Sequence, residues 1–489
     1  MTDQVRVRFA PSPTGFLHVG GLRTALYNYL FARHHGGEFV LRIEDTDQSR
    51  KVEGAIENLI STLEWAGIHY DEGPDRDGGY GPYIQSQRIE TYRKYANQLI
   101  EEGKAYYCFC SPERLEEVRQ RQIQSKLNPS YDRHCRDLPK DQAERRRAQG
   151  DNHVIRMKVP ISGELTFNDL IRGDVTIGYE VLDDQVLVKS DGFPTYHLAV
   201  VVDDHLMGIT HIIRGEEWLP SVPKHILLYQ YFGWELPKLV HLPLLLNPDK
   251  SKLSKRQGDV AVEDYRAKGY LKEAIINFVA LLGWNPGDER EIFTLDELIK
   301  EFSLERVGKA GAVFNVEKLN WLNFEHLRKK PDAEVLVMLK EYLAGSAVHT
   351  KHLDDEYLLR VIGAMRVRVT FVKDFVEKSP YFFRPPVEYD PDVVKKRWKQ
   401  GTPEQMKKLI EELSRLKNPQ KADFEAALHR AAETLKIKHS DLIHAVRLGV
   451  SGMGAGPGLY DILVILGREE TIRRINSAIE RLKVTNQSL

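Results

Sequence analysis

The chain has 489 residues, of which 42% are hydrophobic and 29% charged, which predicts a globular protein of about three or four domains. Its formal net charge of -1 excludes a basic surface over the whole molecule, so any nucleic-acid-binding surface must be a local basic stripe. Three cysteines cannot form a disulfide framework, and the sequence shows neither a signal peptide nor an apolar run that would span a membrane, so we expect a cytoplasmic protein.

The N-terminal segment predicts the start of a parallel α/β sheet. Val5, Val7 and Phe9 alternate with arginines, which indicates a short strand. A turn that contains glycine and proline follows, and then an amphipathic helix that ends near Gly36. A second strand is predicted over residues 38–43. Strand, turn, helix and strand in this order are typical of a doubly wound fold.

Residues 106–191 interrupt this pattern, and we interpret them as an insertion into the sheet domain. A charged helix is predicted over residues 113–123, and strands over 154–159 and 186–188. The α/β pattern then resumes at residues 196–202, 209–214 and 223–232, the last of these as a helix.

The C-terminal part of the chain is predicted to be helical. A basic, polar loop at residues 250–256 is followed by helices over residues 271–282, 295–301 and 316–322. Beyond Lys330 the strand pattern largely disappears, and an apolar period of about 3.6 residues continues almost to the end. Gly467 is expected to stop one of the late helices.

Two short motifs suggest phosphate chemistry. Gly20 and Gly21 stand at a helix entry, where backbone N–H groups can approach an anion and His18 can donate to a phosphate oxygen. The segment Lys252–Arg256 carries three cations and a hydroxyl, as in a mobile loop that neutralises polyphosphate in a transition state. Taken alone, the glycines also fit simple helix capping, and the basic segment also fits a solvated charge run.

Together the two motifs resemble those of a known family. Arg8–Gly15 followed by His18-Val19-Gly20 resembles the "HIGH" signature of class I aminoacyl-tRNA synthetases in its glutamyl form, and Lys252–Arg256 resembles their "KMSKS" loop. Gly21 and Leu253 depart from those signatures, and both changes are common in the glutamyl branch. Residues 42–47, 195–198, 202–205 and 213–218 are also similar to bacterial-type glutamyl enzymes, and the similarity covers nearly the whole chain.

The resemblance implies an α/β fold, in which a Rossmann-type parallel-sheet catalytic domain carries an inserted acceptor-end-binding domain and is followed by an all-α anticodon-binding region. The expected parts are the two halves of the catalytic domain at 1–105 and 192–245, the insertion at 106–191, a stem-contact helical domain with the KMSKS-like loop at 246–330, and the anticodon-binding region at 331–489.

The implied activity is that of a monomeric ligase, which activates L-glutamate with ATP and Mg²⁺ and transfers it to the 3′ end of tRNA-Glu. Family members typically need bound tRNA for activation. The glutamate carboxylate is already a nucleophile, so the enzyme has to position the reactants and stabilise charge on the phosphates. By resemblance, catalysis is assigned to His18, Lys252 and Lys255, ATP binding to these residues and Gly20, and glutamate binding to Arg8, Ser12, Glu44, Tyr196, Arg214 and Trp218.

In this assignment Arg8 and Arg214 face the side-chain carboxylate of glutamate, and the alternative is that both lie on the surface at strand ends. Arg366 and Arg368 lie where the family meets the anticodon, and Arg368 matches the arginine that reads the third anticodon base in enzymes that reject tRNA-Gln.

The cysteines resemble the zinc-binding insertion of some glutamyl enzymes, and a relic of a lost site is the alternative. The implied Zn²⁺ ligands are Cys108, Cys110 and Cys135, with Tyr131 or Asp137 as the fourth.

Three other families fit less well. A glutaminyl enzyme would have a β-barrel anticodon-binding region, and a truncated paralogue that modifies a tRNA base would lack the C-terminal helices. A non-catalytic paralogue should have lost His18 or the lysines of the 252–256 loop, and all are present. The sequence leaves open a non-discriminating enzyme that also charges tRNA-Gln.

Overall fold

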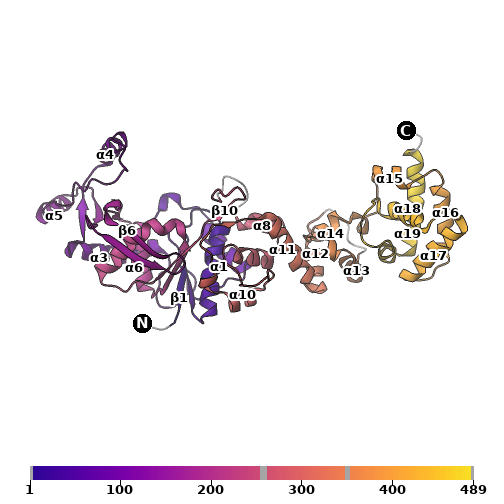
Figure 1. The fold of residues 1–489 in the computed structure, drawn as a ribbon, viewed down its shortest axis with the longest axis horizontal. Coiled ribbons are helices and arrows are strands. Elements are labelled where there is room, and N and C mark those ends of the chain that lie inside the picture. The colour runs from indigo at the N-terminus through magenta and orange to yellow at the C-terminus, as the bar shows by residue number, and fades with distance from the viewer. Residues whose placement is uncertain (1–3, 254–260, 347, 349–352, 486–489) are drawn as a thin grey trace. The chain divides into compact units, whose positions relative to one another are not determined.

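The structure is a computed structural model that describes residues 4–253, 261–346, 348 and 353–485. They divide into two compact units, Met1–Lys268 with Lys272–Lys318 and Gly269–Leu271 with Leu319–Leu489 (Figure 1). Each unit has its own buried apolar side chains. Within the described residues, no helix has the length and apolar character needed to cross a membrane.

The first unit is built on parallel strands, as the sequence predicts. Strand β1 (Arg6–Phe9) pairs in parallel with β2 (Glu38–Leu41), and β8 (His211–Gly215) pairs in parallel with β9 (Lys238–Leu242). The N–H of Thr210 donates to the carbonyl oxygen of Arg6 at 2.9 Å, so β1 lies beside β8. The carboxyl ends of these strands therefore share one edge.

Helix α1 (Val19–His34) connects β1 to β2 and is buried along most of its length. His18 is its N-cap, in an extended conformation, and Arg33 and His34 occupy its last turn, where cations interact favourably with the helix dipole. Gly36 follows with a φ of 62°, a left-handed conformation that glycine adopts without steric cost. The predicted helix and its stop near Gly36 are confirmed.

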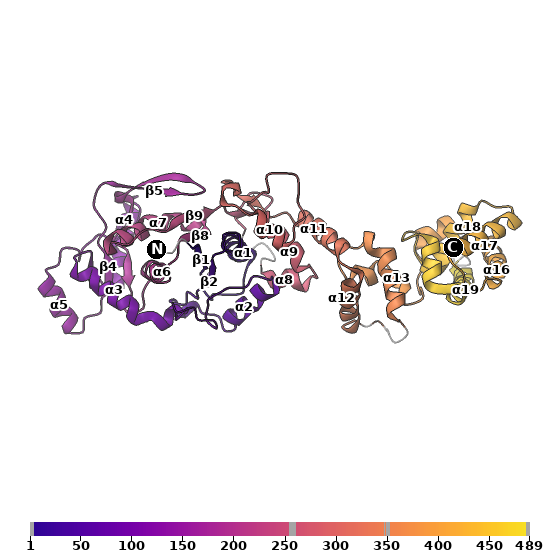
Figure 2. The same ribbon diagram turned by 90° about the horizontal axis from the view of Figure 1, so that it is seen from below.

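The segment between the two halves of this sheet forms two further β structures. An antiparallel sheet consists of β3 (Ala105–Cys108), β4 (Val154–Met157) and β7 (Val186–Val188), with the nearby helices α4 (Pro112–Gln124) and α5 (Lys140–Ala148). A hairpin of β5 (Glu164–Asp169) and β6 (Gly173–Gly178) was not predicted from the sequence. Its last residue in β5, Asp169, pairs in parallel with Leu239 of β9, so the hairpin extends the main sheet (Figure 2).

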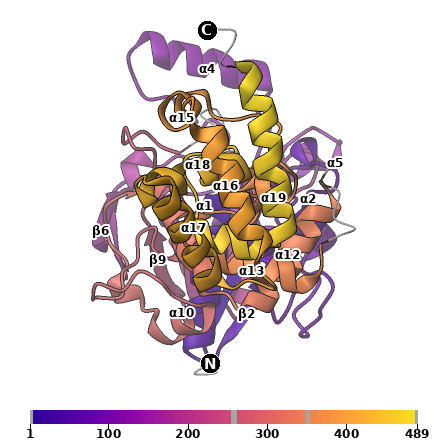
Figure 3. The same cartoon turned by 90° about the vertical axis from the view of Figure 1, so that its right-hand side faces the viewer.

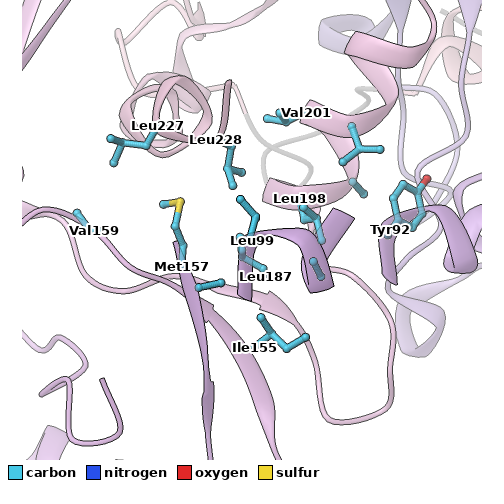
Figure 4. Packing of buried hydrophobic residues seen from close by; sticks show 14 of the residues in the cluster. Tyr92, Leu99, Ile155, Met157, Val159, Leu187, Leu198, Val201, Leu227 and Leu228 are labelled. Atoms are coloured by element: carbon cyan, nitrogen blue, oxygen red, sulfur yellow. The ribbon is translucent and has the colours of Figure 1, made fainter. Parts of the chain in front are cut away.

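A large apolar cluster joins the antiparallel sheet to the helices of the first unit (Figure 4). Met157 and Leu187 of the sheet meet Leu99 of α3 (Ile89–Glu101), Leu198 of α6 (Tyr196–Leu206) and Leu227 of α7 (Val222–Phe232). All five side chains are almost fully buried. This packing fixes the first turn of α6, which carries Tyr196.

The remaining elements of the first unit are α2 (Ala55–Trp65), α8 (Val262–Ala267), α9 (Lys272–Ala280), α10 (Leu295–Glu301) and the parallel pair β10 (Leu245–Leu246) and β11 (Ala312–Val313). Helix α10 begins with a capping box of Thr294 and Glu297 and has the bounds that the sequence predicts. The predicted helix at 271–282 is α9, and α11 (Val316–Lys329) is longer than predicted.

The second unit is helical in all its described regular elements apart from short 3₁₀ turns, as expected (Figure 3). After α11 come α12 (Asp332–Ala344), α13 (Asp355–Met365), α14 (Asp374–Glu377), α15 (Pro391–Arg397), α16 (Thr402–Ser414), α17 (Lys421–Leu435), α18 (His439–Ser451) and α19 (Leu459–Thr485). Gly467 is non-helical, with a φ of 75° and a ψ of 165°, so the first part of α19 ends there as expected and a second helix follows directly.

Candidate active site

A cavity of about 580 Å³ lies at the carboxyl ends of β1 and β8 and at the N-terminus of α1. This is the edge where ligands bind in open parallel sheets. It brings together nine of the residues that the sequence singled out, namely Arg8, Ser12, His18, Gly20, Glu44, Tyr196, Arg214, Trp218 and Lys252.

The N-terminus of α1 on one side of the cavity is formed by His18, Gly20 and Gly21. The ring Nδ1 of His18 accepts a hydrogen bond from the N–H of Gly21 at 3.1 Å, so the proton of the neutral ring belongs on Nε2 as a donor. A Cβ atom at Gly20 would lie 3.0 Å from the His18 ring, and one at Gly21 would lie 2.7 Å from a methyl carbon of Leu17. Side chains there would displace the histidine or its support.

Two buried arginines line the cavity, and each has one guanidinium nitrogen that forms no hydrogen bond with the described residues. Arg8 donates through Nε and Nη2 to the carboxylate of Asp204 at 3.0 and 3.3 Å. Arg214 donates through Nη1 to the Tyr196 hydroxyl at 2.7 Å and through Nε to Nε2 of His241 at 3.1 Å. Among the described residues, these are the only hydrogen bonds of either guanidinium. Nη1 of Arg8 and Nη2 of Arg214 therefore remain as donors for a bound anion.

A network of buried ion pairs holds the side chain of Arg8 in place. Arg42 is fully buried and contacts Asp204 at 2.8 Å and Glu44 at 3.1 Å. Burial alone would raise the pKa of Asp204, but Arg8 and Arg42 hold it below its usual value. Asp203 next to it is held by Arg88 at 2.7 Å. Sequence reasoning gave no role to these supporting groups, although Arg42 and the two aspartates lie in segments similar to the family.

Glu44 and two aromatic rings complete the wall of the cavity. Burial raises the pKa of Glu44 to about 7, although Arg42 and Arg8 act in the opposite direction. The rings of Tyr196 and Trp218 lie 4.5 Å apart between centroids. The arrangement offers cations for a carboxylate, a carboxylate for an ammonium group, and an apolar wall.

Described residues at the start of the basic loop and directly after it contact the cavity wall. Within the loop, Lys252 forms a β-bridge with Leu246 and lines the cavity. After it, Ala261 forms a bridge with His18, and the N–H of Val262 donates to the carbonyl oxygen of Leu17 at 2.9 Å. The two sequence motifs are therefore neighbours in space. Lys255 lies outside the described residues.

The three cysteines gather around a phenol. The Sγ atoms of Cys108, Cys110 and Cys135 all lie within 4.8 Å of one another, and those of Cys110 and Cys135 are 3.6 Å apart. The Tyr131 hydroxyl lies 3.2 Å from the Cys108 sulfur. Asp137 does not belong to this group, and its carboxylate is exposed near Lys158.

The two arginines assigned to the anticodon differ in their surroundings. Arg366 donates to the carbonyl oxygens of Arg328 and Lys330 at 3.1 and 2.6 Å and pairs with Asp332. Arg368 is exposed, and it is one of the groups that lower the pKa of Arg447, after the burial of that guanidinium. Arg366 therefore braces the helices, whereas Arg368 faces outward.

The comparison with protein families gives the class. Residues 4–321 match the tRNA synthetases class I (E and Q), catalytic domain, and residues 334–479 match an anticodon binding domain. The fold and the cavity are thus those of a class I tRNA synthetase of the glutamate and glutamine branch, as the sequence predicts.

Comparison with individual proteins identifies the family within this class. Glutamate–tRNA ligases of Chloroherpeton thalassium and Chlorobaculum parvum are 53% and 54% identical to the chain, over 99% of each chain. The crystal structure of a glutamate tRNA ligase from Elizabethkingia meningosepticum in complex with its amino acid has a TM-score of 0.94 and 42% identity, and covers 98% of this chain and 100% of that one. The chain belongs to the glutamate–tRNA ligase family.

Proposed function

We propose that the cavity at the end of β1 and β8 binds glutamate and ATP, forms glutamyl-adenylate there, and transfers the glutamyl group to the 3′ end of tRNA-Glu. The observation that carries this proposal is the convergence of the His18 helix entry, Lys252 and the open edges of Arg8 and Arg214 on one cavity. Anion-binding groups for a triphosphate and for an acidic amino acid are thereby side by side.

In the first step an oxygen of the glutamate α-carboxylate attacks the α-phosphorus of ATP, and the bond to pyrophosphate breaks. Nε2–H of His18 donates to a phosphate oxygen, and Lys252 and Lys255 stabilise the growing negative charge. Mg²⁺ that arrives with ATP neutralises further phosphate oxygens. A hydroxyl of the terminal tRNA ribose then attacks the carbonyl carbon, and AMP leaves.

The choice of glutamate over glutamine follows from the open guanidinium edges. Nη1 of Arg8 and Nη2 of Arg214 donate to the side-chain carboxylate of glutamate, and Glu44 accepts from its ammonium group. The amide of glutamine would leave a buried guanidinium without a matching charge, which costs on the order of a few kcal/mol.

The experiment is ATP–pyrophosphate exchange in the presence of tRNA-Glu. Arg214→Gln should raise the KM for glutamate strongly while the KM for ATP stays close to the wild-type value. Arg136→Gln is a matched control, because Arg136 is also well buried beside an aspartate, Asp184, but does not line the cavity. An Arg214→Gln enzyme with an unchanged KM for glutamate would refute the assignment of the pocket.

The cysteine cluster fits a zinc ion. Tetrahedral coordination with Zn–S bonds of about 2.3 Å places the sulfurs about 3.8 Å apart, close to the 3.6 Å between Cys110 and Cys135. Cys108 supplies a third thiolate, and Tyr131 is the fourth candidate that lies beside the sulfurs. Bound zinc would hold β3 to the segment around Cys135. We propose a structural role for it, because none of the residues of the cluster lines the cavity.

Different parts of the chain would then bind different regions of the tRNA. The insertion at 106–191 would meet the acceptor end, residues 246–330 the stem, and residues 331–489 the anticodon, while residues 1–105 and 192–245 hold the catalytic sheet. Arg368 would read the third anticodon base, which favours an enzyme that discriminates against tRNA-Gln over a non-discriminating one. We propose that the enzyme acts as a cytoplasmic monomer.

A further inference from the structure

A continuous chain of hydrogen bonds runs from the hairpin to the cavity through three buried side chains. The carboxylate oxygen Oδ2 of Asp169 contacts Nδ1 of His241 at 2.6 Å, and Nε2 of the same ring contacts Nε of Arg214 at 3.1 Å. Asp169 and His241 are 1% and 0% exposed. The three residues come from the neighbouring strands β5, β9 and β8, so this series of hydrogen bonds runs across the sheet.

The partners determine which ring nitrogen of His241 carries the proton. Nε of Arg214 is always a donor, so Nε2 of His241 must accept and cannot be protonated. The proton therefore resides on Nδ1, and this N–H donates a hydrogen bond to Oδ2 of Asp169. Burial keeps the pKa of His241 below its usual value, and nearby Arg214 and Arg8 act in the same direction while Asp169 opposes them. His241 is thus a neutral ring held in one tautomer.

We propose that Asp169 and His241 are positioning residues that orient Arg214 toward the side-chain carboxylate of glutamate by holding His241 in the tautomer that accepts from Nε of Arg214. This inference rests on the proposed role of Arg214 in binding glutamate. With Nε held by His241 and Nη1 held on Tyr196, rotation of the guanidinium is blocked and Nη2 keeps one direction.

The other groups that face His241 do not replace this function. Arg8 of β1 and Arg214 of β8 contribute positive charge, and Asp169 of β5 is the negative group. His225 of α7 packs against Tyr196 and contacts His197 at 3.1 Å, and burial lowers its own pKa well below the usual value. Of these groups, Asp169 is the one that accepts a hydrogen bond from the His241 ring.

The variant Asp169→Asn tests the tautomer directly. Oδ1 of Asp169 already accepts from the N–H groups of Ile171 and Arg172 at 3.0 and 2.9 Å. In the variant, the amide oxygen must stay with these donors, so the amide NH₂ group faces Nδ1 of His241. A donor at that position moves the ring proton to Nε2, where it opposes Nε of Arg214. A nearly isosteric change thereby reverses the hydrogen bond between residue 169 and His241, and it leaves two donors facing each other between His241 and Arg214.

The expected result is a change that is specific to glutamate. In ATP–pyrophosphate exchange with tRNA-Glu, Asp169→Asn should raise the KM for glutamate by about tenfold or more, with the KM for ATP close to wild type. In ¹⁵N-histidine-labelled protein, the His241 signals should change from an Nδ1–H to an Nε2–H pattern. A role in stability alone would not move that signature.

Two further substitutions and a control keep the test decisive if Asp169→Asn folds poorly. His241→Gln can still offer an amide oxygen to Arg214, whereas His241→Leu cannot, so Leu should raise the KM for glutamate more than Gln. Asp184→Asn alters a carboxylate of the same segment that is equally buried and accepts from the N–H of Val159. It should lower stability without a specific change in the KM for glutamate.

The outcomes separate this inference from the pocket assignment. If Arg214→Gln raises the KM for glutamate but Asp169→Asn does not, or if the Gln and Leu variants of His241 are equal, the positioning role is wrong and the pocket stands. An unchanged KM for glutamate in Arg214→Gln overturns both.

Discussion

Glu44 is a residue of the cavity whose charge changes near neutral pH, because burial raises its pKa to about 7. Below that pH the carboxyl is protonated and cannot pair with the ammonium group of glutamate. The KM for glutamate should therefore fall as the pH rises from about 6 to about 8, where the carboxylate is ionised. Measurement of KM across this range checks the prediction.

The variant Glu44→Gln should remove this pH dependence and keep a high KM for glutamate at pH 8. The KM for ATP serves as the internal control, because Glu44 is assigned to the amino acid. A wild-type KM for glutamate that is flat over this range would contradict the role of Glu44.

Arg368 is the residue that we expect to distinguish tRNA-Glu from tRNA-Gln. A guanidinium donates to the acceptor edge of cytosine, whereas guanine presents a donor, and one such contact is worth about 1–3 kcal/mol of discrimination. Arg368→Gln should therefore raise the efficiency on tRNA-Gln relative to tRNA-Glu, measured as kcat/KM for charging. Arg366→Gln is the matched control and should weaken both tRNAs similarly, because Arg366 braces the helices. Equal losses on both tRNAs in both variants would leave Arg368 without a reading role.

The sequence predicted the residues that face ligands better than the residues that hold them. Arg8 and Arg214 stand next to recognisable motifs, and both line the cavity. Asp169 and His241 are 72 residues apart, and neither belongs to a motif. Their role arises from strand pairing, which a single sequence does not specify at that distance.

At the scale of elements, the basic loop carries a prediction about rate. Lys252→Ala and Lys255→Ala remove charges that matter most in the transition state, so activation should slow by about 10²–10³-fold with little change in the KM for glutamate. Lys250→Asn is the control, because Lys250 is exposed, does not line the cavity and has a φ of 66° that asparagine tolerates. Unchanged rates in both alanine variants would show that the loop does not act on the phosphates.

Zinc binding by the cysteine cluster can be tested separately. Metal analysis of protein purified without chelators should give about one equivalent of zinc, which Cys110→Ser should lose and Tyr131→Phe should reduce. His134→Ala and Asp137→Ala should keep the metal, since neither side chain belongs to the cluster. A metal-free wild-type protein that is folded and active would reject the zinc site.

Elements with a clear period were predicted close to their observed bounds, and the hairpin was not. Helix α10 matches its prediction because a capping box marks its start. In β5 the alternation of Leu165, Phe167 and Asp169 as buried positions ends on a charged residue. A buried aspartate weakens the apolar signal of a strand, so the residue that matters most in β5 also conceals it.

For the whole molecule we expect activation to depend on tRNA. Glutamate-dependent ATP–pyrophosphate exchange should be negligible for the protein alone and should appear when tRNA-Glu is added. The physical reason is a shift of population: where the arrangement competent for activation is a minor state of the protein alone, tRNA that binds this state more tightly makes it the major one. tRNA stripped of its acceptor end is the control and should not restore exchange. Robust exchange without any tRNA would contradict this dependence.

The single strand pair between Asp169 and Leu239 also limits how the protein can be cut and recombined. A chimera that replaces residues 106–191 with the equivalent segment of another synthetase would remove the carboxylate that His241 needs. Such a hybrid should accept tRNA yet bind glutamate poorly, unless the incoming segment carries an aspartate at the same register. The borders of an exchangeable module therefore follow the hydrogen bonds across the sheet, and not the turns at which the chain enters and leaves it.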